Sequence, residues 1–404
     1  MSQIKRINIK NILFAILIFT LIILIGYKLC LKKTVVSQFT TEELLEDFDY
    51  MWNFLEQEYL FFPVLEEQGI DIDNIKNNTR EQITAQRPDI ELFYDTLDQM
   101  FLQMDYFAHL SLVNINQYKV YQEYYNSEDS LETGWKDVLQ KEQTVFIYEE
   151  ILSKRKVIEQ DASYPEIEIT YYEKQKAVVF HIKSFDSALI SRDENFISKY
   201  LETMEGVPIE HIVFDITGNP GGNDLYWREN IVKVFGGEYT WTTQLYLRDT
   251  EWTKSYFGNL DYHLIENDVN EDEYPAFTKQ LNTPCFITIE DEICGTAQLK
   301  QEFLNAQRWV LIDNRVYSAA DSFATFCKAT GWATLVGNAT KGDGIGTTPF
   351  IIALPNTGLL VRFSGTASAN AEGCLNALYG TSPDYYSQRW ESPVNTLWEL
   401  IGIE

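Results

Sequence analysis

Short apolar segments alternate with helix-like segments from residue 167 onward. The apolar segments are five or six residues long and rich in Val, Ile, Phe and Leu, which is typical of buried strands. We expect strands at 167–172, 177–182, 211–216, 285–290, 309–313, 333–337, 350–354 and 359–363. We expect helices at 193–206, 223–235 and 319–331. This order predicts an α/β core over residues 166–404.

The first third of the chain has a different period. Residues 40–62 and 90–104 carry apolar side chains at helical spacing, and the glutamates after Thr40 resemble an N-terminal cap. These features predict a helical subdomain over 35–125. Residues 126–165 are rich in Tyr, Gln and Glu without a clear period, and we expect an irregular connecting segment there.

Residues 12–27 form an uninterrupted apolar or small segment, with lysine or arginine on both sides. No small-residue cleavage site follows it, so we expect an uncleaved signal anchor within residues 1–34, a single transmembrane segment. A cleavable signal peptide is the alternative. Because the positive charge is balanced on the two flanks, it does not fix the orientation in the membrane.

The formal charge of the 404-residue chain is −28, and residues 1–41 contain no acidic side chain. An acidic body repels nucleic acid, so nucleic-acid binding is excluded as a function. The histidines and cysteines have no metal-ligand spacing, and we expect neither a metal site nor a cofactor. An even number of cysteines after Cys30 leaves disulfides open, although Cys327 lies in an apolar run typical of a buried thiol. These cysteines are Cys285, Cys294, Cys327 and Cys374.

Two motifs at strand ends carry the chemistry of the chain. The sequence VYSAAD places Ser318 between the strand expected at 309–313 and the helix expected at 319–331. About a hundred residues earlier, DITGNPGG ends another strand in a loop with Gly221 and Gly222. The glycine N–H groups and that of Ala319 could stabilise an oxyanion, and Ser318 is the candidate nucleophile. A serine in this position could instead serve only as a helix N-cap.

These strings, in order with ATLVGNATKGDG, ALPNTGLLVRF and GTSPDYY, resemble the tail-specific (C-terminal processing) and tricorn-type serine peptidase family. The resemblance covers about residues 170–390, and more weakly the segment around residue 109. It implies a crotonase/Clp-like ββα-superhelix core. Family members often carry a PDZ module before this core, which we expect to be absent here.

The two branches of the family that the chain resembles use different general bases to activate the serine hydroxyl. The tail-specific branch uses a lysine, but the matching turn reads TKGDG and places Asp343 at that position, with Lys341 two residues away. The tricorn branch uses a histidine, and DYFAHLSL around His109 resembles its histidine turn. Since histidine has a pKa suited to general-base catalysis, we expect His109 to be the base. The other histidines are His181, His211 and His263.

The carboxylate that orients the base is the least defined member of the site. In the tricorn branch it is a glutamate just before a turn that reads GTSPD here, where this chain has no carboxylate. Glu372, eight residues before that turn, and Asp105, four residues before His109, are the two candidates. We expect Asp321 to support the helix dipole instead.

The sequence therefore predicts a membrane-anchored, extracytoplasmic serine peptidase that cleaves peptide or protein substrates with Ser318 and His109. Two alternatives remain open. One is an inactive binding or scaffold protein on the same fold, favoured by the missing carboxylate and by Thr217, where the family usually has arginine. The other is a non-proteolytic serine hydrolase such as an esterase.

Overall fold

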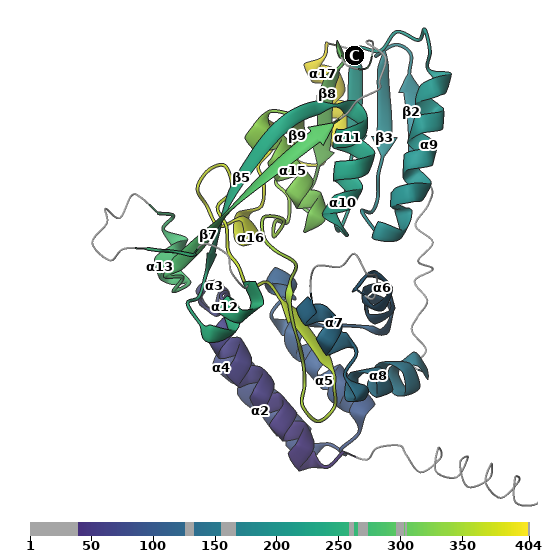
Figure 1. Ribbon diagram of the computed structural model, residues 1–404. Helices are drawn as coiled ribbons and strands as arrows, with labels where there is room; N and C mark the ends of the chain where they lie inside the picture. Colours follow the sequence, from purple (N-terminus) through teal and green to yellow (C-terminus); the bar gives the residue numbers. More distant parts are fainter. Residues whose placement is uncertain are drawn as a thin grey trace, which may run out of the picture.

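The computed structural model describes residues 39–125, 133–154, 167–257, 262–265, 274–295, 303 and 305–402. It has a mixed α/β architecture, with a six-stranded sheet in one half and a group of helices in the other (Figure 1). The signal anchor expected within residues 1–34 lies outside the described residues. Among the helices that the structure describes, none has the length and apolar character needed to cross a membrane.

The six-stranded sheet has the strand order β12-β9-β8-β4-β3-β2. Strand β2 pairs antiparallel with β3, and all the other pairs are parallel. Its strands are β2 (Glu168–Tyr172), β3 (Ala177–His181), β4 (His211–Asp215), β8 (Gln307–Ile312), β9 (Thr334–Gly337) and β12 (Tyr385–Tyr386). The strands expected between residues 167 and 337 are confirmed. Because β4 and β8 pair in parallel, their ends lie side by side.

Side chains of the central strands alternate between the two faces of this sheet, as the period of a strand requires. Phe180, Phe214 and Val310 pack into one cluster, whereas Val213 and Leu311 pack into another on the opposite face. The first face is covered by α9 (Ile190–Thr203), α10 (Asp224–Trp227), the π-helical turn η5 (Arg228–Val232), α11 (Lys233–Phe235) and α15 (Ala319–Thr330). The opposite face is covered by α17 (Pro393–Leu400).

Residues 41–125 are mainly helical, as the sequence predicts. A capping box between Thr40 and Glu43 starts the first described helix. The elements up to β1 are α2 (Thr41–Glu58), α3 (Phe62–Glu67), α4 (Ile72–Ala85), α5 (Ile90–Gln103), the 3-10 turn η1 (Phe107–His109) and β1 (Ser111–Leu112) itself. They are followed by α6 (Ile115–Tyr125), α7 (Thr133–Leu139), α8 (Glu142–Phe146), η2 (Ile147–Ile151) and η3 (Leu152–Lys154).

Helices α7 and α8 correct the expectation of an irregular segment at 126–165 for the part that the structure describes, residues 133–154. The burial of α7, and of the turn η2 that follows α8, depends on aromatic contacts and not on an aliphatic period. Trp135 is buried and stacks on Tyr125 with ring centroids 4.8 Å apart, and Tyr118 stacks on Tyr148 at 4.4 Å. Such pairs stabilise packing without producing a regular apolar pattern in the sequence.

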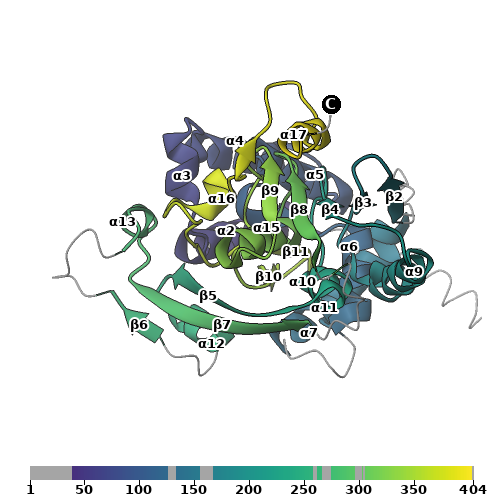
Figure 2. The same ribbon diagram turned by 90° about the horizontal axis from the view of Figure 1, so that it is seen from above.

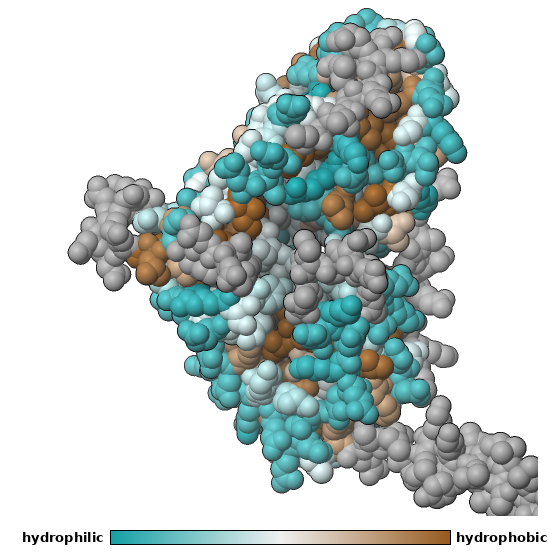
Figure 3. All heavy atoms as spheres, viewed as in Figure 1, coloured by the Kyte–Doolittle hydropathy of each residue, from teal (hydrophilic) through white to brown (hydrophobic). Residues whose placement is uncertain are grey.

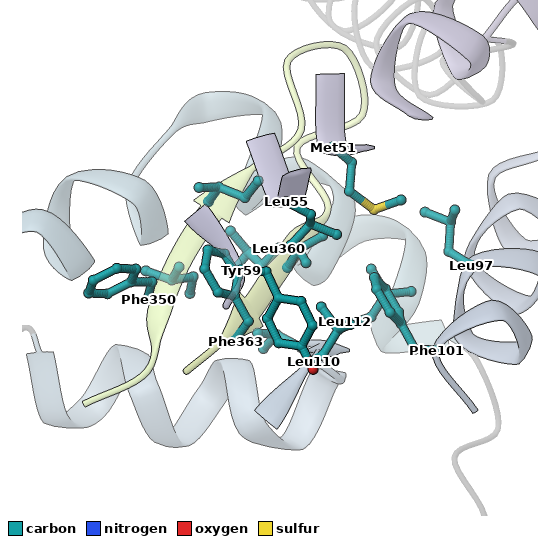
Figure 4. Packing of buried hydrophobic residues seen from close by; sticks show 14 of the residues in the cluster. Met51, Leu55, Tyr59, Leu97, Phe101, Leu110, Leu112, Phe350, Leu360 and Phe363 are labelled. Atoms are coloured by element: carbon teal, nitrogen blue, oxygen red, sulfur yellow. The ribbon is translucent and has the colours of Figure 1, made fainter. Parts of the chain in front are cut away.

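The hairpin of β10 (Phe350–Ala353) and β11 (Leu360–Phe363) belongs to the helical half and not to the α/β core in which we expected it. β11 pairs with β1, and the hairpin packs between the N-terminal helices (Figures 1 and 4). The two strands are joined by a turn at residues 355–358. The buried carboxylate of Asp47 on α2 accepts hydrogen bonds from the backbone N–H groups of Asn356 and Thr357, at 2.7 and 2.8 Å. Through the hairpin, helix α2 therefore fixes the segment that follows β11.

A long antiparallel ribbon was not fully expected. β5 (Gly237–Leu247) pairs along its whole length with β7 (Cys285–Gly295), and β6 (Tyr262–Leu264) adds a third strand. Figure 2 shows this ribbon curving along one side of the molecule, with α12 (Glu251–Phe257) and α13 (Phe277–Gln280) beside it. The N-terminal half of β5 alternates between exposed and partly buried residues, so its sequence lacks the apolar run that predicts a buried strand.

Cys285, Cys327 and Cys374 are free thiols. Burial raises the pKa of Cys285 to about 11 and that of Cys327 well above its usual value, so both stay protonated near neutral pH. The side chain of Cys294 lies outside the described residues, as does Cys30.

Candidate active site

Ser318 occupies a sharp turn between β8 and α15. Its φ and ψ are 54° and −128°, a left-handed backbone that a residue with a side chain adopts at a cost of about 1–3 kcal/mol. The turn is held because Ser318 N–H donates to Gly342 O at 3.1 Å and Ser318 O accepts from Ser322 N–H at 2.9 Å. The Ser318 hydroxyl does not cap helix α15. The side chain is therefore directed to another partner.

That partner is His109, which lies in an equally unusual turn. Tyr106, Ala108 and His109 all have positive φ, between 48° and 59°. The turn is fixed from outside: Tyr59 Oη donates to Phe107 O, and the N–H of Ser364 donates to Ala108 O, both at 2.8 Å. The His109 side chain is only 9% exposed. Its ring is thus held in place by α2, which ends beside Tyr59, and by the segment after β11.

His109 Nε2 lies 3.1 Å from Ser318 Oγ, and His109 Nδ1 lies 2.5 Å from Asp343 Oδ2. A neutral imidazole carries one ring proton, and a carboxylate can only accept. The proton therefore sits on Nδ1 and is donated to Asp343, which leaves the Nε2 lone pair to accept the Ser318 hydroxyl proton. Ser318, His109 and Asp343 have the connectivity of a catalytic triad.

The Asp343 side chain is only 7% exposed, and its Oδ2 atom has several partners. Besides the His109 ring, Oδ2 accepts the hydroxyl groups of Ser364 and Tyr317, each at 3.0 Å. The turn carrying Asp343 requires a glycine at residue 342, because a Cβ there would lie 2.2 Å from Asn376 O. The sequence places Asp343 where the tail-specific branch has its lysine, and in the fold this position faces the base.

Neither carboxylate proposed from the sequence contacts His109. Glu372 accepts a hydrogen bond from Ser382. Asp105 is 75% exposed and pairs with Lys341 at 3.7 Å. The reason is the left-handed turn at residues 105–109, which breaks the helical spacing that would have brought Asp105 alongside His109. The orienting position is occupied by Asp343 instead.

Asp321 does more than complement the helix dipole. It is fully buried in the first turn of α15, and burial raises the pKa of its carboxyl group despite several hydrogen bonds. Its oxygens accept from Thr340 Oγ1 at 2.5 Å, Gly344 N at 3.0 Å and Asn376 Nδ2 at 3.0 Å. Since Thr340 and Gly344 flank Asp343, this network joins the serine's helix to the turn that carries Asp343.

The glycine loop approaches the serine from the end of β4. A Cβ on Gly221 would lie 2.6 Å from Tyr317 O and 2.9 Å from Ser318 Cβ, so only glycine fits. The Gly221 N–H already donates to Asn219 Oδ1 at 2.9 Å. The N–H groups of Gly222 and Ala319 donate no hydrogen bond within the part of the chain that the structure describes. These two N–H groups are therefore the better candidates for an oxyanion site.

Sequence reasoning missed Asp343, Tyr317 and Ser364 as members of the site. A signal was present for the first: a carboxylate in a glycine-flanked turn at the very position where related sequences place a base. Tyr317 and Ser364 carry no pattern of their own. Among the described residues, no group of three His, Cys, Asp or Glu side chains is placed to hold a metal ion.

The family model for peptidase family S41 matches residues 176–387, which is more than half of the chain. The chain belongs to peptidase family S41. It is accordingly a serine-type peptidase, the class that the motifs around Ser318 predict. The S41 match spans β3 to β12 and includes Ser318 and Asp343, while His109 lies before it.

Solved structures share the fold of this S41 peptidase at low sequence identity. A protein from Parabacteroides merdae, described as a candidate peptidase, is 15% identical with a TM-score of 0.50, covering 89% of this chain and 96% of that one. Mature CPAF is 13% identical with a TM-score of 0.51, covering 86% and 92%. CPAF complexed with lactacystin is 12% identical with a TM-score of 0.50, covering 86% and 94%. No curated protein sequence matches the chain.

Proposed function

We propose that this S41 peptidase cleaves peptide bonds through an acyl-enzyme on Ser318, with His109 as general base and Asp343 as the orienting carboxylate. The observation that carries the proposal is the pair of contacts on one imidazole ring, 3.1 Å from Nε2 to Ser318 Oγ and 2.5 Å from Nδ1 to Asp343 Oδ2. Both lie in the range needed for proton transfer and for fixing the tautomer.

In the first half of the reaction, Ser318 Oγ attacks the scissile carbonyl carbon while its proton moves to His109 Nε2. The imidazolium so formed is stabilised by the Asp343 carboxylate. The N–H groups of Ala319 and Gly222 donate hydrogen bonds to the former carbonyl oxygen and stabilise its negative charge. His109 then protonates the leaving amine, and the C–N bond breaks to give the acyl-enzyme.

In the second half, water enters in place of the amine. His109 removes its proton, the hydroxide attacks the ester carbon, and Ser318 Oγ leaves with the proton returned from Nε2. The cycle restores the neutral ring with its proton on Nδ1. It needs no cofactor, because all proton movements are carried by Ser318, His109 and water.

The proposed triad combines features of the two branches that the sequence resembles. The histidine comes from the tricorn-like position, while its carboxylate comes from the turn in which the tail-specific branch carries lysine. The apparently missing carboxylate was one reason to consider an inactive scaffold, and Asp343 supplies that carboxylate. Thr217 has its own role: its N–H and hydroxyl donate to Asp215 at 3.0 and 2.6 Å, which closes the loop after β4.

Replacing the base and the nearby lysine separates the two branch mechanisms. We expect His109→Gln to lower kcat/KM by roughly 10²-fold or more, because a general base contributes about 10²–10⁴. Lys341→Met should leave it within about twofold, since Lys341 faces exposed Asp105. The measurement is peptide turnover on a fluorogenic library, with an ester panel alongside. An inactive Lys341→Met variant together with near-native turnover in His109→Gln would show that the base is the lysine. Turnover of esters without turnover of peptides would show that the protein is an esterase.

We also propose that residues 1–34 anchor the peptidase to a membrane, with the catalytic part outside the cytoplasm. The support is the apolar segment at 12–27 with cationic flanks. The described part of the chain has a largely hydrophilic surface on the face in Figure 3. Orientation rests on the family resemblance alone.

Deleting residues 1–34 should give a folded protein that stays in the soluble fraction, because the first described helix begins only at Thr41. Fractionation of the full-length and truncated chains, both assayed for peptide turnover, checks this expectation. If the truncated protein still partitions with membranes, the anchor lies elsewhere. Protease accessibility of the full-length chain in intact cells tests the orientation.

A further inference from the structure

The hydroxyl of Tyr317 bridges the base and its carboxylate. Tyr317 Oη accepts the backbone N–H of His109 at 3.1 Å and donates to Asp343 Oδ2 at 3.0 Å. The two rings lie 4.8 Å apart between centroids, with an angle of 32° between their planes. One side chain therefore contacts the His109 backbone, the His109 ring and the Asp343 carboxylate.

The backbone of Tyr317 connects the remaining parts of the site. Its N–H donates to Asn219 O at 3.2 Å, which joins it to the glycine loop. It forms an isolated bridge with Gly342, next to Asp343, and it immediately precedes Ser318. Residues more than two hundred positions apart in the chain thus meet on this one residue.

We propose that Tyr317 is a positioning residue of the triad, whose hydroxyl holds the His109 turn and the Asp343 carboxylate in register with Ser318. This inference rests on the proposed function, because it concerns the same triad. Tyr317 transfers no proton in the reaction. It acts through the two groups that it connects.

Ser364 also holds the turn through its backbone N–H, but its hydroxyl has a narrower reach than that of Tyr317. Ser364 Oγ donates to Asp343 Oδ2 at 3.0 Å and lies 3.1 Å from His109 Nδ1, but the His109 backbone N–H is bound by Tyr317. Tyr317 also stays a donor: burial, and then the Asp343 charge, raise its pKa well above the usual value. The charged groups facing its ring and hydroxyl are Asp343, His109 when protonated, Arg362 and Lys341, whose Nζ lies 5.7 Å from the ring centroid.

Tyr317→Phe removes the hydroxyl and keeps the ring. We expect kcat to fall about 10- to 100-fold, as for the loss of a hydrogen bond to a charged group, with KM changed by less than about twofold. Asp343 loses a donor that favours its charged form, and the His109–Asp343 pair then holds a proton more tightly. The acid limb of the kcat/KM profile should therefore move to higher pH.

Tyr148→Phe is the matched control. Tyr148 is buried, and its hydroxyl also bridges two backbone segments, accepting from Leu360 N at 3.1 Å and donating to Val113 O at 2.8 Å, without touching the triad. We expect it to lower the melting temperature but to leave kcat and the pH profile unchanged. NMR titration of His109 in Ser318→Ala, with and without Tyr317→Phe, gives a readout that does not depend on turnover.

The outcomes are distinguishable. Similar losses in both tyrosine variants, with unchanged pH profiles and an unchanged His109 titration, would overturn the positioning role and leave Tyr317 purely structural. A shifted titration with reduced kcat in Tyr317→Phe alone supports it. Undiminished turnover in Ser318→Ala would contradict the proposed function itself, whatever Tyr317 does.

Discussion

Ser318→Ala is expected to lower peptide turnover by about 10⁴-fold or more, because loss of the nucleophile removes the acyl-enzyme route altogether. The fold should be almost unaffected. The Ser318 hydroxyl does not cap α15, and an alanine in its place would have the same backbone strain that the serine already has. The melting temperature should therefore stay close to that of the wild type.

Ser322→Ala provides the control, because it removes a hydroxyl from the same helix. Ser322 Oγ contacts Asp224 Oδ2 at 3.0 Å and does not touch His109. We expect this variant to keep its turnover within a few-fold of the wild type. Persistent turnover in a folded Ser318→Ala protein would rule out Ser318 as the nucleophile.

Asp343→Asn is the second large effect, and its direction follows from the tautomer. The Asp343 carboxylate can only accept, so it holds the His109 proton on Nδ1. An asparagine amide can donate to Nδ1 instead, which places the proton on Nε2, where it blocks acceptance from Ser318. We expect kcat to fall by about 10³–10⁴-fold with little change in KM. Steady-state kinetics on one peptide substrate measures this.

Glu372→Gln and Asp105→Asn are matched controls, since both neutralise a carboxylate that the sequence made a candidate for the same role. Glu372 contacts Ser382, and Asp105 pairs with Lys341, so both variants should remain active. If Asp343→Asn were near wild type while Glu372→Gln lost activity, the orienting role would pass to Glu372.

Much of the fold could be predicted because local pattern and tertiary role agree. The strands β3, β4 and β8 are buried on both faces, so they read as continuous apolar segments. Helix α7 was missed because the aromatic contacts of Trp135 with Tyr121 and Tyr125 replace an aliphatic period. The place of the β10–β11 hairpin was missed because its pairing with β1 joins Arg362 to Ser111, a contact that no local pattern encodes.

The site divides in the same way. Ser318 and the Gly221–Gly222 pair stand at strand ends where the fold needs a sharp turn, so their positions are visible in the sequence. The partnership of His109 with Asp343 joins residues 234 positions apart, and it depends on left-handed turns at both ends. Helical spacing favoured Asp105 as the orienting carboxylate, and loop proximity favoured Glu372. Neither criterion takes account of a turn that reverses the chain.

The central claim is that Ser318 is a nucleophile activated by the His109–Asp343 pair, and covalent labelling tests it most directly. A fluorophosphonate probe reacts with an activated serine hydroxyl, and peptide mapping by mass spectrometry locates the adduct. We predict a single adduct on Ser318, formed at least about a hundredfold more slowly in His109→Gln. Labelling on a different serine, or at an undiminished rate on Ser318 in both His109→Gln and Asp343→Asn, would contradict this account.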